Sequence, residues 1–184
     1  MVMATETKHW TLAELDRLPN DGNKYELVRG ELFVTPAPSP LHETIGARLS
    51  ALLTPYVIKE RLGYVYHPRA VVMFDGSQAE PDMMVRQPDA EEDHPTWETA
   101  PTPLLVLEIA SRTTRRRDRN EKRTFYREAS VPEYWIVDGA DRTITIVKPM
   151  SADEVIRDTM CWHPMGASEP LCFDMSEVFG KPKR

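Results

Sequence analysis

Hydrophobic and polar residues alternate with different periods along the chain, and its first part already predicts two kinds of element. Thr11 and Glu14 are spaced as in a capping box, before leucines at intervals of three, which predicts a short first helix. Strand-forming residues dominate positions 24–28 and 31–35, and the arginine-glycine pair between them is typical of a hairpin turn.

A long amphipathic helix is predicted next. Ser39 is a candidate N-cap directly before Pro40, and apolar residues then recur at spacings of three and four as far as Tyr56. Pro55 lies within this stretch. We expect it to kink the helix or to end it early, because proline cannot donate the helical hydrogen bond.

The middle of the chain predicts strands. One or two are expected in residues 64–74, broken near Pro68, and a short one at 83–85. The acidic, proline-containing stretch 87–103 is typical of a loop. Residues 104–110 form an almost unbroken apolar run, which is typical of a central strand buried on both faces.

The last third of the chain alternates helix and strand. We expect a helix at 116–129, strands at 133–137 and 143–147, and a weak strand with a short helix near 175–179. This order predicts a mixed α/β (α+β) fold, in which a mixed central sheet is flanked by helices.

Composition narrows the class of protein. With 41% hydrophobic and 28% charged residues, the 184-residue chain is expected to form one domain over 1–184, with a core at about 10–180. Its longest apolar runs stay well below the ~18 residues of a membrane span, and the first ten residues lack the apolar core of a signal peptide. We therefore expect a cytoplasmic protein without a membrane partner.

The two cysteines do not predict a disulfide framework. Cys161, His163 and Cys172 could be three zinc ligands, but they lack the paired spacing of structural zinc sites. The alternative that we favour is two buried or half-buried thiols near a C-terminal strand.

Charge is distributed unevenly along the chain. A net charge of −6 and a pI of about 5.4 argue against a protein that coats nucleic acid with its whole surface. Residues 112–123, however, hold seven basic residues against two acidic ones. This local basic segment predicts one phosphate-facing site, or alternatively a solvated helix face.

Two carboxylates are candidates for chemistry. Glu108 interrupts the apolar run, where a lone carboxylate is costly unless something pairs with it. It is either paired with a structural arginine or acts as a metal ligand or general base. Asp82 follows Pro81, which limits where its carboxylate can point, although such a pair is more often a turn.

The helix after Glu108 supplies a third candidate group. Asp118, Lys122, Phe125 and Ala129 share one helical face, and its apolar members indicate that this face is buried. Lys122 then points toward the sheet, unless it only pairs with Asp118 along the helix. Two carboxylates and an inward lysine could bind a hard divalent cation and polarise a water against a phosphate.

Several motifs spread over the chain resemble one known family. They are Asp82 after Pro81, Glu108 in Leu-Val-Leu-Glu-Ile, then Ser111, Asp118, Lys122 and Tyr126, Val-Pro-Glu-Tyr-Trp-Ile-Val-Asp at 131–138, and Tyr-Glu-Leu-Val-Arg-Gly-Glu-Leu at 25–32. Together, over about residues 10–180, they resemble the Uma2 family, a large bacterial group of restriction endonucleases.

This resemblance implies a restriction-endonuclease-like PD-(D/E)XK fold and an endonuclease that hydrolyses DNA phosphodiester bonds with Mg2+ or Mn2+. In that superfamily an Asp and a Glu hold the metal, and a Lys activates or orients the attacking water. Asp82 and Glu108 match the two acids. The usual lysine position holds Ala110, so the resemblance assigns this role to Lys122, and Glu26 matches an early acid that can complete the metal shell.

The resemblance also implies contacts with nucleic acid. His42 matches a recurrent histidine at a helix start, which contacts a phosphate or water, or alternatively caps or packs. From the basic segment itself, Arg112, Arg115, Arg116 and Arg117 are expected to bind phosphates, or alternatively to form a solvated helix start. The expected partners are DNA and a second copy of the chain in a homodimer. The alternatives are a non-catalytic nucleic-acid-binding or regulatory module on this frame, and a relative that cuts RNA.

Two positions depart from the family pattern. Residues 111–114 read Ser-Arg-Thr-Thr where Ser-Pro-Ser-Thr is usual, which adds a positive charge. Ser130 replaces the usual glycine before Val-Pro-Glu-Tyr-Trp, where a helix C-cap prefers the left-handed conformation. Neither change removes a candidate catalytic residue.

Overall fold

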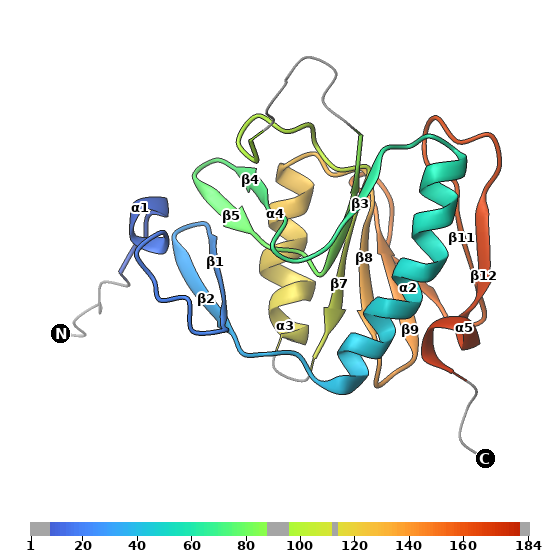
Figure 1. Ribbon diagram of the computed structural model, residues 1–184, viewed down its shortest axis with the longest axis horizontal. Coiled ribbons are helices and arrows are strands. Elements are labelled where there is room, and N and C mark those ends of the chain that lie inside the picture. The colour runs from blue at the N-terminus through green and yellow to red at the C-terminus, as the bar shows by residue number, and fades with distance from the viewer. Residues whose placement is uncertain (1–7, 88–95, 112–113, 181–184) are drawn as a thin grey trace.

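A computed structural model describes residues 8–87, 96–111 and 114–180, and a six-stranded mixed sheet lies at its centre (Figure 1). Its strand order is β10-β9-β8-β7-β6-β3. The strands are β3 (Tyr64–Tyr66), β6 (Met83–Arg86), β7 (Leu105–Ala110), β8 (Tyr134–Asp138), β9 (Thr143–Val147) and β10 (Glu154–Ile156). β7 and β8 are parallel, and the other neighbours are antiparallel. The predicted mixed sheet is thus confirmed, with the apolar run 104–110 as a central strand.

A second, four-stranded antiparallel sheet has the order β2-β1-β5-β4. It consists of β1 (Lys24–Val28), β2 (Glu31–Thr35), β4 (Val72–Phe74) and β5 (Ser77–Ala79), and α1 (Leu12–Leu15) precedes it. Arg29 and Gly30 both have positive φ angles, 54° and 80°, as a tight hairpin turn requires. The predicted capping box of α1 and the predicted hairpin are both confirmed.

Helix α2 (Pro40–Lys59) begins as predicted but ends later. Ser39 caps it, because its hydroxyl accepts a hydrogen bond from the backbone N–H of His42. The helix does not end early at Pro55, although this was one of the two outcomes expected there. Pro55 lies on the exposed side, and the next two residues, Tyr56 and Val57, are buried in the core, so packing outweighs the missing hydrogen bond.

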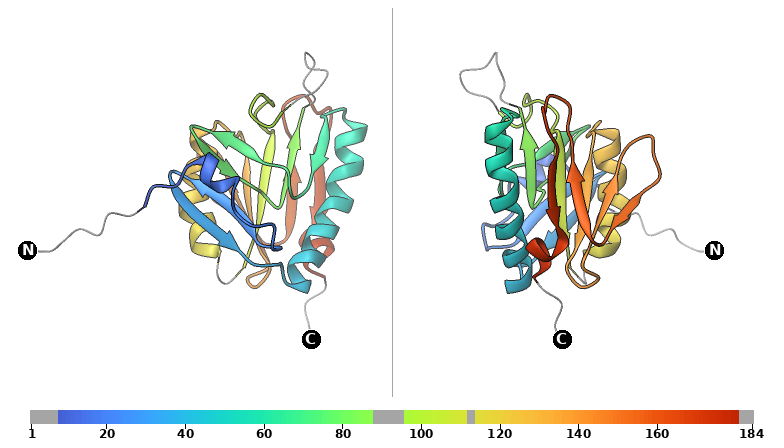
Figure 2. Two further views of the ribbon diagram at one scale, coloured as in Figure 1. Left: turned by 60° about the vertical axis from the view of Figure 1, so that its left-hand side comes forward. Right: turned by 90° about the vertical axis from the view of Figure 1, so that its right-hand side faces the viewer.

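The second long helix covers the opposite face of the central sheet from α2 (Figure 2). It runs as α3 (Arg115–Arg117), a π-helical turn η1 (Asp118–Lys122) and α4 (Arg123–Glu128), close to the predicted helix at 116–129. Both Lys122 and Phe125 are buried, as the helical spacing predicted. A π-helical turn adds one residue locally and often occurs at functional sites.

The C-terminal segment contradicts the interpretation of the cysteines. It contains β11 (Thr159–Trp162), β12 (Leu171–Asp174) and α5 (Met175–Phe179), and it therefore has more strand than the sequence indicated. Cys161 and Cys172 lie opposite each other in the β11–β12 hairpin and form a disulfide, with both residues exposed. The prediction of two buried or half-buried thiols is therefore wrong, and the zinc alternative fails because the two sulfurs bond each other.

None of the helices among the described residues is both long enough and apolar enough to cross a bilayer.

Candidate active site

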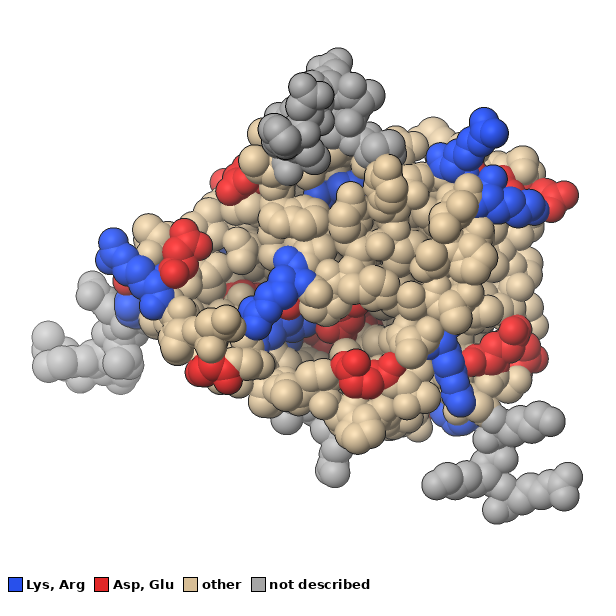
Figure 3. All heavy atoms as spheres, viewed as in Figure 1, with Lys and Arg blue, Asp and Glu red and all other residues tan. Residues whose placement is uncertain are grey.

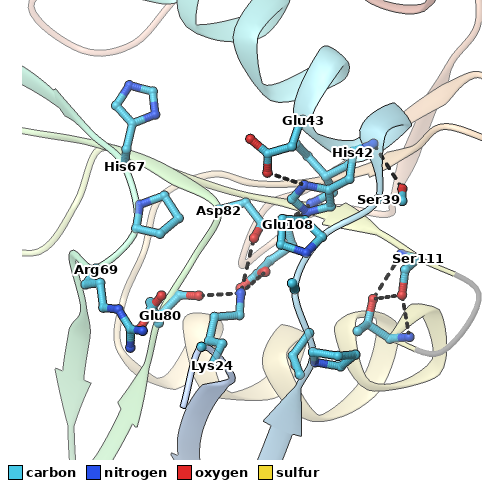
Figure 4. A pocket seen from close by; sticks show the side chains of 18 of the residues that line it. Lys24, Ser39, His42, Glu43, His67, Arg69, Glu80, Asp82, Glu108 and Ser111 are labelled. Atoms are coloured by element: carbon cyan, nitrogen blue, oxygen red, sulfur yellow. Dashed lines mark hydrogen bonds and ion pairs between the residues drawn. The ribbon is translucent and has the colours of Figure 1, made fainter. Parts of the chain in front are cut away.

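A pocket of about 580 Å³ opens where the start of α2 approaches residues at or beside the ends of β1, β6 and β7. Charged side chains of both signs gather around a hollow near the centre of the face shown in Figure 3. Lys24, His42, Asp82, Glu108 and Arg117 line this pocket, although they come from segments far apart in the sequence. Figure 4 shows the first four of them close together at its floor.

Asp82 lies directly before β6 and is held from several sides. Its Oδ2 atom accepts a hydrogen bond of 2.7 Å from the backbone N–H of Ile109 and lies 3.0 Å from Nε2 of His42. Its Oδ1 atom accepts a hydrogen bond of 3.1 Å from Nζ of Lys24. Burial raises the pKa of Asp82, but the charges of Lys24 and His42 outweigh it and hold this pKa well below its usual range. Asp82 is therefore a stable carboxylate.

Glu108 is buried in β7, yet its two oxygens have different surroundings. Oε1 accepts a hydrogen bond of 2.7 Å from the hydroxyl of Tyr126 and contacts Nζ of Lys122. Oε2 lies 3.9 Å from Nζ of Lys24. Burial raises the pKa of Glu108 to about 7, against the opposing effect of Lys122 and Lys24. The two candidate acids thus differ strongly in their affinity for a proton, a difference that is typical of active sites.

Lys122 reaches from the π-helical turn to the sheet and is fully buried. Its Nζ contacts Glu108 and lies 2.7 Å from Oε1 of Glu26 on β1. Glu26 also accepts a hydrogen bond of 2.8 Å from the N–H of Glu80 and lies 3.5 Å from Arg117. The structure therefore brings Lys122 to Glu108, and it places Glu26 in a buried network around Lys122.

Lys24 is the residue that the sequence analysis missed. Its ammonium donates to the carbonyl oxygen of Glu80 at 2.9 Å and to Asp82, and it faces Glu108 (Figure 4). Burial lowers the pKa of Lys24, but the carboxylates of Glu108 and Asp82 more than offset this and raise it. One signal was present in the sequence: Lys24 precedes Glu26 by two residues in a strand, so both side chains lie on the same face.

The carboxylate oxygens of Asp82 and Glu108 that face Lys24 suit a hard divalent cation. One oxygen of Asp82 and one of Glu108 are held by protein groups, and the second oxygen of each faces the same ammonium. Carboxylate oxygens are the ligands that Mg2+ and Mn2+ prefer, and an ammonium between them shows that this point favours positive charge. Among the described residues, no three His, Cys, Asp or Glu side chains are placed to hold a metal ion together, so the candidate ligands are the pair Asp82 and Glu108.

His42 lines the pocket from the first turn of α2. Burial lowers the pKa of its imidazole, but the hydrogen bond with Asp82 and the charge of this carboxylate outweigh burial, so the pKa is raised. Nε2 of His42 faces Asp82 and its Nδ1 lies 3.7 Å from Oε1 of Glu43, so both ring nitrogens point at carboxylates. The sequence prediction that His42 contacts phosphate or water remains a prediction.

The predicted phosphate-binding arginines have different surroundings. Arg117 lines the pocket, donates to the hydroxyl of Thr35 at 3.1 Å and lies over the ring of Phe33. Arg115 is paired with Asp138 at 2.8 Å, and Arg116 is exposed.

The fourth of these arginines, Arg112, lies outside the described residues. The structure therefore places one of the predicted arginines, Arg117, at the pocket.

Comparisons with known proteins give a family and a fold. The model of the Uma2 family, described as "Putative restriction endonuclease", matches residues 12–160. A crystal structure described as a putative nuclease belonging to DUF820, from Anabaena variabilis ATCC 29413, is similar with a TM-score of 0.79 and 20% sequence identity. The similarity covers 92% of this chain and 97% of that chain. A search of curated proteins finds no match. The matched residues span most of the chain, which therefore belongs to the Uma2 family of putative restriction endonucleases and has a nuclease-like mixed α/β fold.

Proposed function

We propose that this protein hydrolyses DNA phosphodiester bonds with a divalent metal ion, Mg2+ or Mn2+, in the pocket between β1, β6, β7 and α2. The observation that carries the proposal is the convergence of Asp82 and Glu108. Oδ1 of Asp82 and Oε2 of Glu108 face the same ammonium, that of Lys24, in an open pocket, although 26 positions separate the two residues in the sequence. Membership of the Uma2 family supports the same class of reaction.

Asp82 and Glu108 would hold the metal ion through these two oxygens, and water and a substrate phosphate would supply further ligands. A divalent cation bound there supplies Lewis-acid chemistry, because it polarises a phosphate and makes water easier to deprotonate. The N–H of Ile109 and the imidazole of His42 keep Asp82 in the orientation that this role requires.

Lys122 and Tyr126 act on the reaction through Glu108. Both bind Oε1, which fixes the carboxylate so that Oε2 faces the pocket. The positive charge of Lys122 also stabilises the negative charge that develops nearby when a phosphate is attacked. Glu26 holds Lys122 in place from its other side, at 2.7 Å. Lys122 and Glu26 are thus positioning residues in this proposal.

Arg117 would be the group of the pocket that binds a phosphate. It lines the pocket, and a guanidinium carries several N–H donors. Arg116 is exposed on the adjacent helix, where it can contact the nucleic-acid backbone beyond the pocket. Two such pockets, one for each strand, would let both strands of a duplex be cut in one binding event. We therefore propose a homodimer as the active form, which sedimentation of the protein with and without DNA would test.

A cleavage assay tests the proposed function. Supercoiled plasmid, duplex oligonucleotide and RNA oligonucleotide are incubated with Mg2+ or Mn2+, or with a chelator. We expect DNA to be cut only when the metal is present. Glu108→Gln and Asp82→Asn should abolish this cutting, and circular dichroism should show that both variants are folded. Glu169→Gln changes an exposed glutamate outside the pocket and should retain full activity.

The other outcomes of this assay identify the alternatives. Cutting of RNA alone would identify the protein as a ribonuclease. Binding of DNA without cutting under every metal condition would indicate a non-catalytic module on a nuclease frame. Full activity of Glu108→Gln would overturn the assignment of the site.

A further inference from the structure

We propose that Lys24 is a built-in counter-ion of the Asp82–Glu108 pair, which occupies the cation position in the metal-free protein and leaves it when a divalent cation binds. This inference rests on the proposed function, because it takes Asp82 and Glu108 as the metal-binding pair. It adds a residue, Lys24, whose movement sets how readily the site accepts a metal.

The contacts of Lys24 resemble those of a bound hard cation. Three oxygens surround its ammonium: the carbonyl oxygen of Glu80 at 2.9 Å, Oδ1 of Asp82 at 3.1 Å and Oε2 of Glu108 at 3.9 Å. A set of two carboxylate oxygens and one carbonyl oxygen is typical of sites for such cations. The ammonium therefore lies where the oxygens favour positive charge most.

The remaining oxygens of the two acids are held by other groups. Oδ2 of Asp82 is bound by the N–H of Ile109 and by His42, and Oε1 of Glu108 is bound by Tyr126 and by Lys122. A cation that entered from the pocket would consequently meet Oδ1 and Oε2, the two oxygens that face Lys24. The ammonium and the metal ion compete for the same atoms.

Asp82 and Glu108 already contact cationic groups when no metal ion is bound. Lys24 lies beside both carboxylates, and Lys122 contacts Glu108. A divalent cation beside an unmoved Lys24 would place like charges a few ångströms apart in a buried environment, where their repulsion is strong. One of the cationic side chains must therefore withdraw.

Lys24 is the side chain that can withdraw. Lys122 has no exposed surface, whereas the side chain of Lys24 is 15% exposed and lines the open pocket. A displaced Lys24 would remain in that pocket, where its ammonium could meet a phosphate of the nucleic acid. Metal binding and nucleic-acid binding would then favour each other, since a phosphate gives the displaced charge a new partner.

Calorimetric titration with Mn2+ alone, without nucleic acid, tests this inference. Lys24→Met removes the ammonium and keeps a side chain of similar length. We expect it to bind Mn2+ roughly tenfold more tightly than the wild type, or tighter, because a cation within ~4–6 Å changes the proton affinity of a carboxylate by a similar factor. Lys59→Met, at an exposed lysine outside the pocket, is the matched control and should leave the affinity unchanged.

A second measurement uses the wild-type protein and so does not depend on the folding of a variant. Lysines are acetylated with a limiting amount of reagent, with and without Mn2+, and the sites are quantified by mass spectrometry. Lys24 should be acetylated little in the metal-free protein and severalfold more with saturating Mn2+, because displacement exposes it. Lys59 is exposed in both states and should be acetylated equally.

The outcomes separate this inference from the proposed function. If Asp82→Asn abolishes Mn2+ binding and cleavage, but Lys24→Met binds Mn2+ no more tightly than the wild type, the role of Lys24 is wrong and the nuclease stands. Acetylation of Lys24 that does not respond to Mn2+ would overturn the displacement in the same way. If Asp82→Asn and Glu108→Gln leave Mn2+ binding unchanged and no variant affects cleavage, both proposals fail.

Discussion

The two faces of the central sheet are both buried, but they contain different kinds of contact. On one face Leu107 and Trp135 pack against Leu49 and Leu53 of α2 in an apolar core. On the other face Val106 and Ile136 pack against Phe125 and Tyr126, and the same face also holds Glu108 and Lys122. Leu107 and Glu108 are neighbours in β7, and strand alternation points them to opposite faces.

This difference shows what each face contributes. Burial of apolar side chains stabilises the fold at roughly 25 cal/mol for each Å² removed from water, so the α2 face supplies stability directly. Charges on the second face lose hydration, and their pairing repays this only when every partner is present. The face that holds Glu108 therefore contributes less to stability than its burial suggests, and it carries the chemistry.

The largest expected effect follows from removal of Lys122. Lys122→Met leaves Glu26 and Glu108 buried without the ammonium that both contact, which should destabilise the protein by about 3–5 kcal/mol. The cleavage rate per folded molecule should fall by about two to three orders of magnitude, the usual scale for one electrostatic donor. Urea unfolding and single-turnover cleavage measure the two effects.

Mn2+ affinity separates a role in the reaction from a merely structural one. Lys122→Met also removes a positive charge that contacts Glu108, so Mn2+ binding should be at least as tight as in the wild type while the rate falls. Lys148→Met alters an exposed lysine and should change neither quantity. A Lys122→Met protein that is unstable but cleaves at the wild-type rate would make Lys122 structural only.

The next effect contrasts the two neighbours in β7. Leu107→Ala leaves a cavity in the apolar face and should cost about 2–5 kcal/mol of unfolding free energy, with the cleavage rate per folded molecule nearly unchanged. Glu108→Gln should abolish cleavage while stability stays equal or rises, because a buried charge is removed. If both substitutions lowered stability alike, the two faces would not differ in the way proposed.

The fold was largely predictable because local spacing determines which side chains are buried. The apolar run 104–110, the hairpin with its arginine-glycine turn and the inward helical face that contains Lys122 all follow from local features of the sequence. The end of α2 was not predictable, since the packing of Tyr56 and Val57 outweighs the local effect of Pro55. The disulfide was missed because the opposition of Cys161 and Cys172 depends on the register of a hairpin.

The candidate site was predictable only in part. Asp82, Glu108 and Lys122 were found because each departs from its local pattern or matches a family motif. Lys24 was missed because its position between Asp82 and Glu108 arises from the packing of one sheet against another, which sequence spacing does not report. The ion-pair partners of the basic segment 112–123, such as Asp138 for Arg115, could not be predicted for the same reason.

A smaller effect concerns the dependence of stability on pH in the metal-free protein. The pKa of Glu108 is about 7 in the folded protein, against an ordinary value of 4.5. Between these values the folded state binds more protons than the unfolded state, so stability should fall as the pH rises from about 4.5 to 7. The lowered pKa of Asp82 acts in the opposite sense, and its contribution is lost as the pH falls below about 3.8.

Urea unfolding in a chelating buffer, repeated across this pH range, measures the dependence. Glu108→Gln should make this fall smaller, and the raised pKa values of Glu80, Asp118 and His42 should account for what remains. Leu107→Ala should lower the whole curve without changing its slope, since the apolar face does not titrate. The same slope in Glu108→Gln and in the wild type would show that Glu108 does not titrate as proposed.

The smallest effect concerns the helix that covers the charged face. After Ala129 the chain turns at Ser130, whose φ is 59°, and the N–H groups of Ser130 and Val131 bond to the carbonyl oxygens of Arg127 and Tyr126. This hydrogen-bond pattern is the helix ending that glycine favours, and a serine there is strained by about 1–2 kcal/mol. Glycine loses roughly 0.5–1 kcal/mol more backbone entropy on folding, so Ser130→Gly should stabilise the protein by about 0.5–1 kcal/mol in urea unfolding.

Ser130→Gly tests the difference between the two faces because it stabilises the end of the helix that packs on the charged face without altering any charge. Cleavage and Mn2+ affinity should remain at wild-type values, since Ser130 is exposed and lies outside the pocket. Ser130→Ala keeps the Cβ atom and therefore the strain, and it should not show the gain. If Ser130→Gly were instead less stable than the wild type, the serine hydroxyl would contribute more than the backbone conformation costs, and the helix end would be adapted to serine.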